Sequence, residues 1–198
     1  MHMDSIFSDY LRSQQRPYER VTLIKLAYVH LLEPKVYGDE RGFFLESFNQ
    51  RDFEEAIRKS VNFVQDNHSC SQKGVLRDLH YQIRHPQGKL VRVTRGEVFD
   101  VVVDLRRSSS LFGQHTSALL NSVNHHQLWI PPGFAHGFLV LSETAEFLYK
   151  TTDYWFPEHE RTLLWNDPDL EIDWPDKHPQ LSPKDLIGMP LKESEIFG

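Results

Sequence analysis

The sequence predicts a mainly β protein, built as a barrel or double-sheet jelly roll with a few short helices. Many short runs of β-branched and aromatic residues are separated by Pro and Gly, and helical patterns are few. The chain has 198 residues, of which 39% are hydrophobic, enough for one globular domain with a sizeable core. We therefore expect a single domain over residues 21–198, preceded by a polar extension over residues 1–20.

The N-terminal extension is the first expected element. It is polar overall, but Ile6, Phe7, Tyr10 and Leu11 recur at helical spacing. That pattern fits a short amphipathic helix, and the composition fits a disordered arm equally well. The sequence leaves both readings open.

Strands follow from Val21 onward, beginning with a β-rich stretch from Leu23 to Leu32. Farther along, Lys89–Thr94 and Val98–Leu105 flank a short turn that contains Gly96, an arrangement that predicts a β-hairpin. Three more short strands are expected at Gln127–Ile130, Gly137–Leu141 and Ala145–Thr151.

Two helices are expected among these strands. The stretch Asp52–Lys59 places its apolar side chains on one face. A second helix is expected to begin at the sequence Ser182-Pro183-Lys184-Asp185. There, Ser182 is a favourable N-cap and Pro183 suits the first helical position.

Composition narrows the classes of function. No apolar run approaches the roughly 20 residues that a membrane helix needs, and the N-terminus lacks the apolar core of a signal peptide. Cys70 is the only cysteine, so no internal disulfide is possible. The formal net charge of -6 argues against broad nucleic-acid binding. We expect a cytoplasmic protein that binds neither membranes nor nucleic acids.

Several cofactor signatures are absent from the sequence. It contains no G-x-G-x-x-G, no phosphate-binding P-loop and no G-x-S-x-G nucleophile motif. Metal-binding barrels of this class use an H-x-H pair on one strand, and His80 has no such partner. His125 and His126 are adjacent, so on a strand they would point to opposite faces. We therefore expect no bound metal.

Three segments are too unusual for a plain scaffold: Gly74–Gln82 followed by Gln87-Gly88-Lys89, then Trp129–Phe138, then Phe147–Trp155. Two shorter motifs precede them, Asp39–Phe44 and Gln65-Asp66-Asn67. In this order and at these spacings, the chain resembles the dTDP-4-dehydrorhamnose 3,5-epimerase family from about Leu31 to Asp185. The resemblance implies a cupin jelly roll, usually a homodimer. It also implies conversion of dTDP-4-dehydro-6-deoxy-D-glucose to dTDP-4-dehydro-L-rhamnose by inversion at C3 and C5, without metal or organic cofactor.

The resemblance also assigns roles to residues. The catalytic base is His80, its orienting partner is Asp185, and the proton donor on the other face is Tyr149; Lys89 sits near the reacting sugar. Further contacts to the dTDP-linked 4-keto-6-deoxy sugar are implied at Arg41, Glu46, Gln65, Asn67, Arg77, His136, Glu160 and Lys184. An N-terminal strand is commonly exchanged between subunits, so that residues near Arg41 and Glu46 reach the partner's site. The β-rich stretch before them suits an exposed edge.

Inversion of a carbon beside a ketone needs only a base, a partner for that base, a group that stabilises the oxyanion and a proton donor. A hydrogen beside the C4 ketone is acidic because the negative charge left by its removal spreads onto oxygen. His80 is a suitable base because an imidazole ordinarily titrates near 6.5. The carboxylate of Asp185 would fix its tautomer, and Lys89 would stabilise the oxyanion. Inversion then requires a proton from the opposite face, which Tyr149 would deliver.

Plainer readings remain for each residue. A lone His is more often structural, Asp185 could merely favour the first turn of a helix, and Tyr149 could be an ordinary strand aromatic. Arg41 and Arg77 could be surface ion pairs rather than phosphate ligands. For the whole chain, the alternatives are a single-carbon epimerase, a ketoisomerase, a non-catalytic nucleotide-sugar-binding cupin and a metal-dependent cupin oxygenase.

Two positions depart from the family pattern. Asp78 stands where Gly is usual, and Trp155 stands where Tyr is usual. On a regular strand, Asp78 shares a face with His80. A carboxylate there would compete for Arg77, repel a pyrophosphate and favour the protonated form of His80. Trp155 keeps an aromatic face and is expected to be tolerated.

Overall fold

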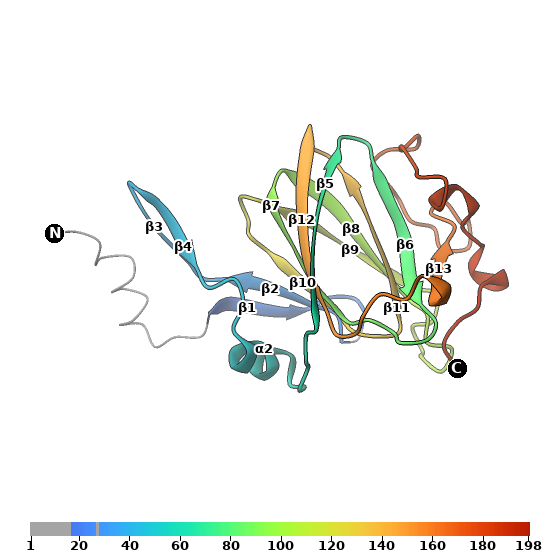
Figure 1. Ribbon diagram of the computed structural model, residues 1–198, viewed down its shortest axis with the longest axis horizontal. Helices are drawn as coiled ribbons and strands as arrows, with labels where there is room; N and C mark the ends of the chain where they lie inside the picture. Colours follow the sequence, from blue (N-terminus) through green and yellow to red (C-terminus); the bar gives the residue numbers. More distant parts are fainter. Residues whose placement is uncertain (1–16, 27) are drawn as a thin grey trace.

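A computed structural model describes residues 17–26 and 28–198. Two antiparallel sheets face each other in a cupin-type jelly roll, which confirms the predicted fold class (Figure 1). The larger sheet contains, in spatial order, β1 (Tyr18–Leu23), β2 (His30–Pro34), β10 (Gln127–Ile130), β7 (Lys89–Arg95), β12 (Thr144–Thr151) and β5 (Gln65–Gln72). The smaller sheet contains β13 (Glu160–Leu163), β6 (Leu76–Gln82), β11 (Phe134–Val140), β8 (Glu97–Asp104) and β9 (His115–Asn121).

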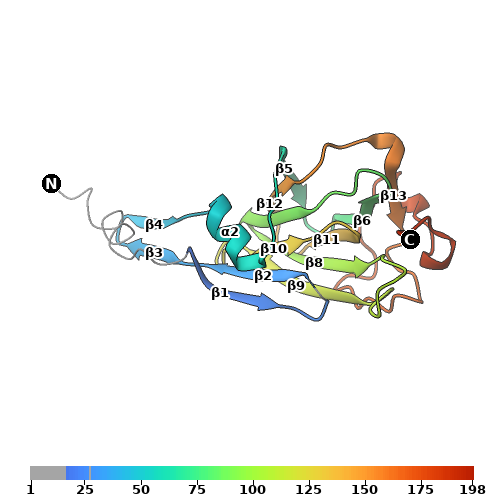
Figure 2. The ribbon, with the colours of Figure 1, turned by 90° about the horizontal axis from the view of Figure 1, so that it is seen from below.

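A separate two-stranded hairpin, β3 (Val36–Asp39) with β4 (Gly42–Leu45), lies outside both sheets. It projects away from the jelly roll on the side of β1 and β2 (Figures 1 and 2). Short 3₁₀ turns complete the described part of the chain: η1 (Pro157–His159), η2 (Asp185–Ile187) and η3 (Leu191–Glu193).

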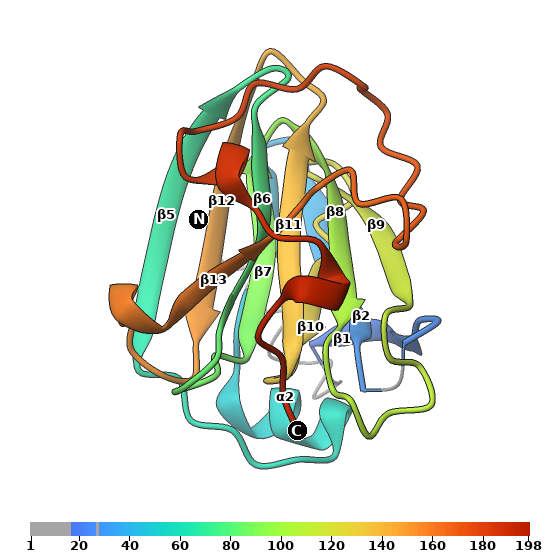
Figure 3. The same ribbon diagram turned by 90° about the vertical axis from the view of Figure 1, so that its right-hand side faces the viewer.

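Apolar side chains fill two layers around the smaller sheet. Its inner face packs against the larger sheet through residues such as Val102, Phe138 and Phe147. On its outer face, Leu76, Leu79 and other residues pack against the C-terminal segment. That segment crosses the sheet after β13 (Figure 3). Because both faces are covered, β8 and β11 are buried along almost their whole length.

The expected helix is present as α2 (Gln50–Ile57), shifted by two residues from Asp52–Lys59. The Asn49 side chain caps it by accepting a hydrogen bond from the Asp52 backbone N–H at 3.3 Å. Phe53 and Ile57 are buried, and the helix ends where Arg58 adopts a left-handed conformation, with φ of 54°.

The predicted hairpin around Gly96 is wrong. β7 and β8 follow one another in the chain, but they belong to different sheets. Gly96 has φ of +75°, and a Cβ there would lie 2.0 Å from the Thr144 carbonyl oxygen, so the chain turns a tight corner between the sheets. Two β-rich runs around a tight turn are typical of a corner between sheets as well as of a hairpin. Only the strands with which each run pairs distinguish a corner from a hairpin.

The helix expected from Ser182 onward is reduced to the 3₁₀ turn η2. Ser182 Oγ does accept from the Asp185 backbone N–H, at 3.2 Å, as a capping residue would. The turn ends at Gly188, because the next residue, Met189, pairs with Thr162 of β13 through its backbone N–H. This pairing anchors the turn beside the smaller sheet.

At the N-terminus, the stretch around Ile6–Leu11 lies outside the described residues, so its expected helix or arm stays a prediction. β1 begins at Tyr18, three residues before the point at which strands were expected. It forms one edge of the larger sheet, as an exchangeable N-terminal strand would. Among the described residues, no helix is long and apolar enough to cross a membrane.

Candidate active site

The centre of the site is a hydrogen-bonded pair formed by His80 and Asp185. His80 lies on β6, and its Nε2 is 2.6 Å from Asp185 Oδ1. The other carboxylate oxygen accepts from the Ser182 hydroxyl at 2.8 Å. Burial acts to raise the pKa of Asp185, but the hydrogen bonds from His80 and Ser182 outweigh it and hold the pKa below its usual value. Asp185 is therefore an ionised acceptor that fixes the proton of His80 on Nε2.

A β-bulge in β6 sets the direction of His80. His136 of β11 pairs with His80, but Phe138, two residues on, pairs with Arg77, so β6 contains one extra residue. Gly137 of β11 lies against the bulge, where a Cβ would stand 2.7 Å from the Arg77 carbonyl oxygen. Arg77 and His80 are three residues apart, and the bulge turns both away from the outer apolar layer. Arg77 is exposed, and its Nε donates to Ser71 Oγ of β5 at 3.0 Å.

The bulge also corrects the expectation for Asp78. Its side chain does not share a face with His80. One oxygen accepts from the Leu79 backbone N–H at 2.7 Å, and the residue is only 1% exposed. Burial raises the pKa of Asp78 to about 8; the charge of Asp185 adds to this, and the Leu79 and Trp165 backbone N–H groups oppose it. Asp78 therefore faces the C-terminal segment and does not compete for Arg77.

The opposite wall of the barrel carries Tyr149 on β12 and Lys89 on β7. Burial raises the pKa of Tyr149, partly opposed by the charge of Arg77 across the barrel. Burial lowers the pKa of Lys89 to about 8, opposed by Glu160 and Asp100. The expected base, His80, and the expected donor, Tyr149, thus come from different sheets.

Glu160 contacts three neighbouring side chains: those of His80, Lys184 and Trp155. Its carboxylate lies 3.7 Å from His80 Nδ1, forms an ion pair with Lys184 and accepts from the Trp155 indole N–H at 3.1 Å. Burial acts to raise the pKa of Glu160, but Lys184, His80 and Trp155 outweigh it, so the pKa is lowered. The nitrogen of His80 that Asp185 does not hold therefore faces the Glu160 carboxylate, whose other oxygen pairs with Lys184.

His136 is buried and paired with a carboxylate. It is 7% exposed, and its Nε2 is 2.9 and 3.1 Å from the two carboxylate oxygens of Asp100. Burial lowers the pKa of His136, opposed by Asp100. We did not predict Asp100 as a site residue. A signal was present, because it is a lone acid inside the apolar run Val98–Val103.

Gln65 and Asn67 lie on β5, next to Tyr149. Asn67 is the direct register partner of Tyr149, and its side-chain oxygen accepts from Gln65 Nε2 at 2.9 Å. Gln65 also accepts from the Trp155 backbone N–H at 3.4 Å. Trp155 thus contacts two residues of the predicted set, Gln65 and Glu160.

Gln82 holds the loop that carries Trp155, a role the motif did not reveal. It is 3% exposed, and its amide donates to the carbonyl oxygens of His85 and Tyr154. Its oxygen accepts from the Phe156 N–H at 2.6 Å. The bonds to Tyr154 and Phe156 fix the chain on both sides of Trp155, and the bond to His85 ties the loop after β6 to the same side chain.

Arg41 and Glu46 are not brought to this site. Arg41 stands at the tip of the β3–β4 hairpin and pairs with Asp39, with 2.6 Å between nitrogen and oxygen. Glu46 directly follows β4. The hairpin points away from the barrel that holds His80 (Figure 2).

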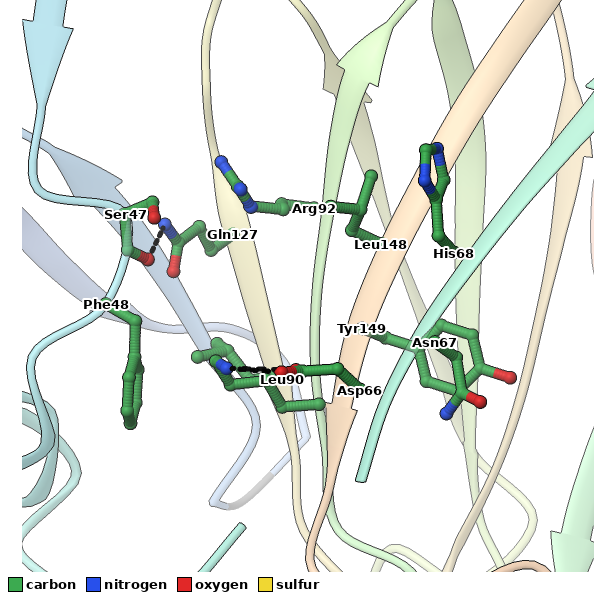
Figure 4. Close-up of a pocket in the computed structure, with 11 residues that line it drawn as sticks. Ser47, Phe48, Asp66, Asn67, His68, Leu90, Arg92, Gln127, Leu148 and Tyr149 are labelled. Atoms are coloured by element: carbon green, nitrogen blue, oxygen red, sulfur yellow. Dashed lines mark hydrogen bonds and ion pairs between the residues drawn. The ribbon is translucent and has the colours of Figure 1, made fainter. Parts of the chain in front are cut away.

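A cavity of about 500 Å³ opens between Phe48 and the larger sheet. Asn67 and Tyr149 are the predicted site residues that line it, and their side chains lie together, apart from Arg92 and Gln127 (Figure 4). The described residues contain no group of three or more His, Cys, Asp or Glu side chains placed to hold a metal ion.

Comparison with known proteins gives concordant results. A family model described as dTDP-4-dehydrorhamnose 3,5-epimerase matches residues 24–193. The chain is 61% identical to the dTDP-4-dehydrorhamnose 3,5-epimerase of Pseudomonas aeruginosa, over 90% of this chain and 99% of that protein. Its fold is similar to dTDP-6-deoxy-D-glucose-3,5-epimerase from Legionella pneumophila in complex with dTDP-4-keto-L-rhamnose, with a TM-score of 0.87, 51% identity and coverage of 89% and 94%. It is also similar to ChmJ, a 3'-monoepimerase from Streptomyces bikiniensis, with a TM-score of 0.81, 30% identity and coverage of 85% and 86%.

Proposed function

This chain belongs to the dTDP-4-dehydrorhamnose 3,5-epimerase family, and from that premise we propose how its own residues act. The protein is an epimerase that inverts C3 and C5 of dTDP-4-dehydro-6-deoxy-D-glucose to give dTDP-4-dehydro-L-rhamnose. One observation carries the assignment of roles. A histidine held by a buried carboxylate stands on one sheet, and a half-buried tyrosine stands on the other.

His80 removes the proton beside the ketone. Asp185 accepts from Nε2–H, so the lone pair on Nδ1 takes the proton from carbon. The electron pair of the broken C–H bond moves to the C4 oxygen, which becomes an enolate. Asp185 stabilises the imidazolium that forms, and the Lys89 ammonium stabilises the enolate oxygen.

Tyr149 completes the inversion. When the enolate collapses, the phenol of Tyr149 gives its proton to the opposite face of the same carbon. Burial raises the pKa of Tyr149, so the phenol stays protonated until that step. Solvent then restores the proton of Tyr149 and removes the proton of His80. The C4 ketone of the substrate holds the charge, so this sequence of steps needs no metal or organic cofactor.

Binding of the nucleotide sugar falls to the remaining predicted residues. Arg77 supplies its exposed guanidinium to the pyrophosphate. Gln65, Asn67, His136, Glu160 and Lys184 surround the sugar and its linkage. A cytoplasmic location belongs to this proposal, because the single cysteine and the absence of a membrane helix among the described residues agree with it.

We propose that the last two ligands, Arg41 and Glu46, act in the site of a second copy. The β3–β4 hairpin projects from its own barrel, and Phe43 on it is 60% exposed. A two-fold dimer would place each hairpin at the partner's barrel and make each site depend on both chains. The β1 edge supplies a further surface for pairing.

Mixing two inactive variants tests the dimer. His80→Ala and Arg41→Ala chains, denatured and refolded together, would give mixed dimers in which one site lacks both residues and the other is intact. Random pairing should restore about a quarter of the wild-type activity, since half of the dimers are mixed and each has one working site. No recovery, or a compact active monomer by light scattering, would show that each chain works alone.

Solvent exchange tests the reaction itself. In deuterated water, the wild type should incorporate deuterium at both C3 and C5 of the sugar, and His80→Ala should incorporate none. Deuterium at one carbon alone would make this chain a single-carbon epimerase, as the similarity to a 3'-monoepimerase allows. Binding of dTDP without exchange at either carbon would identify a non-catalytic binder.

A further inference from the structure

Trp155 joins the two sheets on the side of the barrel where β5 and β13 form their edges (Figure 3). Its backbone N–H donates to Gln65 Oε1 of β5 at 3.4 Å. Its indole N–H donates to Glu160 Oε2 of β13 at 3.1 Å. Trp155 therefore ties one sheet edge to the other, although the residue is 54% exposed.

The loop holds this indole in a fixed place. Gln82, which is 3% exposed, donates to the Tyr154 carbonyl oxygen at 3.1 Å and accepts from the Phe156 backbone N–H at 2.6 Å. Lys184 also pairs with Glu160 Oε2, but its side chain is 47% exposed and sits on a flexible stem that can follow the carboxylate. Of the two donors to this oxygen, the indole is the one that fixes its position.

The other oxygen of Glu160 faces the catalytic histidine. Oε1 lies 3.7 Å from His80 Nδ1, which is longer than a hydrogen bond. Burial acts to raise the pKa of Glu160, but its hydrogen bonds and the nearby cations outweigh it, so Glu160 is ionised. A carboxylate thus stands just short of the nitrogen that takes the proton from carbon.

A closer approach of Glu160 would impair the base. At hydrogen-bond distance, roughly 0.5–1 Å nearer, Oε1 would hold a proton on Nδ1 while Asp185 holds the proton on Nε2. The imidazolium of His80 would then be stabilised from both sides, and Nδ1 would have no lone pair to offer to the substrate. The remaining titratable groups around this pair are those that act on His80 or on Glu160: His136 of β11, Lys89 of β7, Tyr149 of β12 and Lys184.

We propose that Trp155 is a positioning residue for the reaction: its indole N–H holds Glu160 away from His80 Nδ1 and so keeps that nitrogen free to act as the base. This rests on the proposed function. The residue touches neither reacting atom in this role and acts only through Glu160.

The pH dependence of kcat/KM tests the proposal. Trp155→Phe keeps an aromatic ring on the loop and removes the N–H donor. A hydrogen bond from the imidazolium to the released carboxylate should move the acid limb of the profile up by about one pH unit. The ratio of variant to wild type should therefore be constant above both limbs and fall about tenfold further below them, because protonated His80 then persists to higher pH. A ratio that does not change with pH would overturn the proposal, whatever the absolute loss.

Two comparisons isolate the contact with Glu160. Tyr154→Phe is the matched control, since its neighbouring ring is 56% exposed and the residue bonds to Gln82 through its carbonyl oxygen, so its profile should match the wild type. Glu160→Gln removes the charge that would hold the proton. Adding Trp155→Phe to Glu160→Gln should leave the acid limb in place, and a shift of the same size in that background would contradict a route through Glu160.

A measurement without substrate separates this proposal from the proposed function. The ring signals of His80, assigned from their absence in His80→Ala, should titrate with a midpoint about one pH unit higher in Trp155→Phe than in the wild type. An unchanged midpoint in a protein that exchanges deuterium at C3 and C5 would overturn the positioning role alone. A raised midpoint in a protein that exchanges none would support the contact through Glu160 and contradict the proposed function.

Discussion

Replacing Asp185 by Asn should slow turnover about 10³- to 10⁴-fold while leaving the fold intact. Both oxygens of Asp185 accept hydrogen bonds, one from His80 at 2.6 Å and one from the Ser182 hydroxyl at 2.8 Å. An amide has one acceptor oxygen and one NH₂ group, so one of these partners must change its role. Ser182 already accepts from the Asp185 backbone N–H, and therefore favours keeping its own hydroxyl as a donor.

The amide oxygen should consequently turn to Ser182 and the NH₂ group to His80. His80 would then carry its proton on Nδ1, the nitrogen that must be free to accept a proton from carbon. An amide in the corresponding place of a Ser-His-Asp triad fixes the wrong tautomer and lowers turnover about 10⁴-fold. Loss of charge alone would be milder: charged and neutral hydrogen bonds differ by about 1–2 kcal/mol, a factor of roughly 5 to 30 in rate.

A second change separates these two contributions. Ser182→Ala added to Asp185→Asn removes the preference for the wrong orientation, so the double variant should turn over at least about tenfold faster than Asp185→Asn alone. In the wild-type background, Ser182→Ala should slow the enzyme only slightly. The assay is solvent deuterium uptake at C3 and C5, with circular dichroism to confirm folding. Turnover of Asp185→Asn within about threefold of wild type would refute the role of Asp185, since even loss of its charge alone should exceed that.

Three further predictions concern stability and the second proton. Gly137→Ala should lower the free energy of unfolding by about 2 kcal/mol or more, because the new Cβ would lie only 2.7 Å from the Arg77 carbonyl oxygen in the bulge. The control is Gly38→Ala, whose Cβ would lie 3.6 Å from the Gly42 carbonyl oxygen, and both variants are compared by thermal melting. The pKa of Asp78 is raised to about 8 in the folded protein from 3.8 in the unfolded chain, so its ionisation destabilises the fold only above about pH 3.8. Asp78→Asn, which cannot ionise, should therefore raise the free energy of unfolding by roughly 4 kcal/mol at pH 7 and change it little near pH 4. Equal effects at both values of pH in denaturant titrations would contradict that sign. Tyr149→Phe should reduce net inversion more than initial deuterium uptake, and equal losses would argue against Tyr149 as the opposite-face donor.

Local patterns in the sequence were enough for the fold class, for several of the expected strands and for the helix α2. The strands at Gln127–Ile130 and Ala145–Thr151 were predicted within a residue or so because alternation and Pro or Gly boundaries are properties of the segment itself. Helix α2 was predictable for the same reason, from three apolar side chains on one face. The motif around His80 and the late Asp185 also predicted a pair that the structure brings to 2.6 Å.

Two errors involve partners distant in the chain. The corner at Gly96 was read as a hairpin because the strands that flank it resemble those of a hairpin, and only their neighbours β12 and β11 assign them to different sheets. The turn after Ser182 was read as a helix, but pairing of Met189 with β13 ends it after one turn. In both cases, a contact between remote segments overrides a local preference.

The sequence by itself determined which chemical groups this protein has: an imidazole, a carboxylate, a phenol and a lysine, in motifs whose resemblance to the family implies proton transfer beside a ketone. The tertiary structure alone decided where they point. One extra residue in β6 turns Arg77 and His80 to the same side and turns Asp78 toward the C-terminal segment. A bulge exists only as a mismatch between two paired strands, so its position depends on β11 and on Gly137, which are far away in the chain.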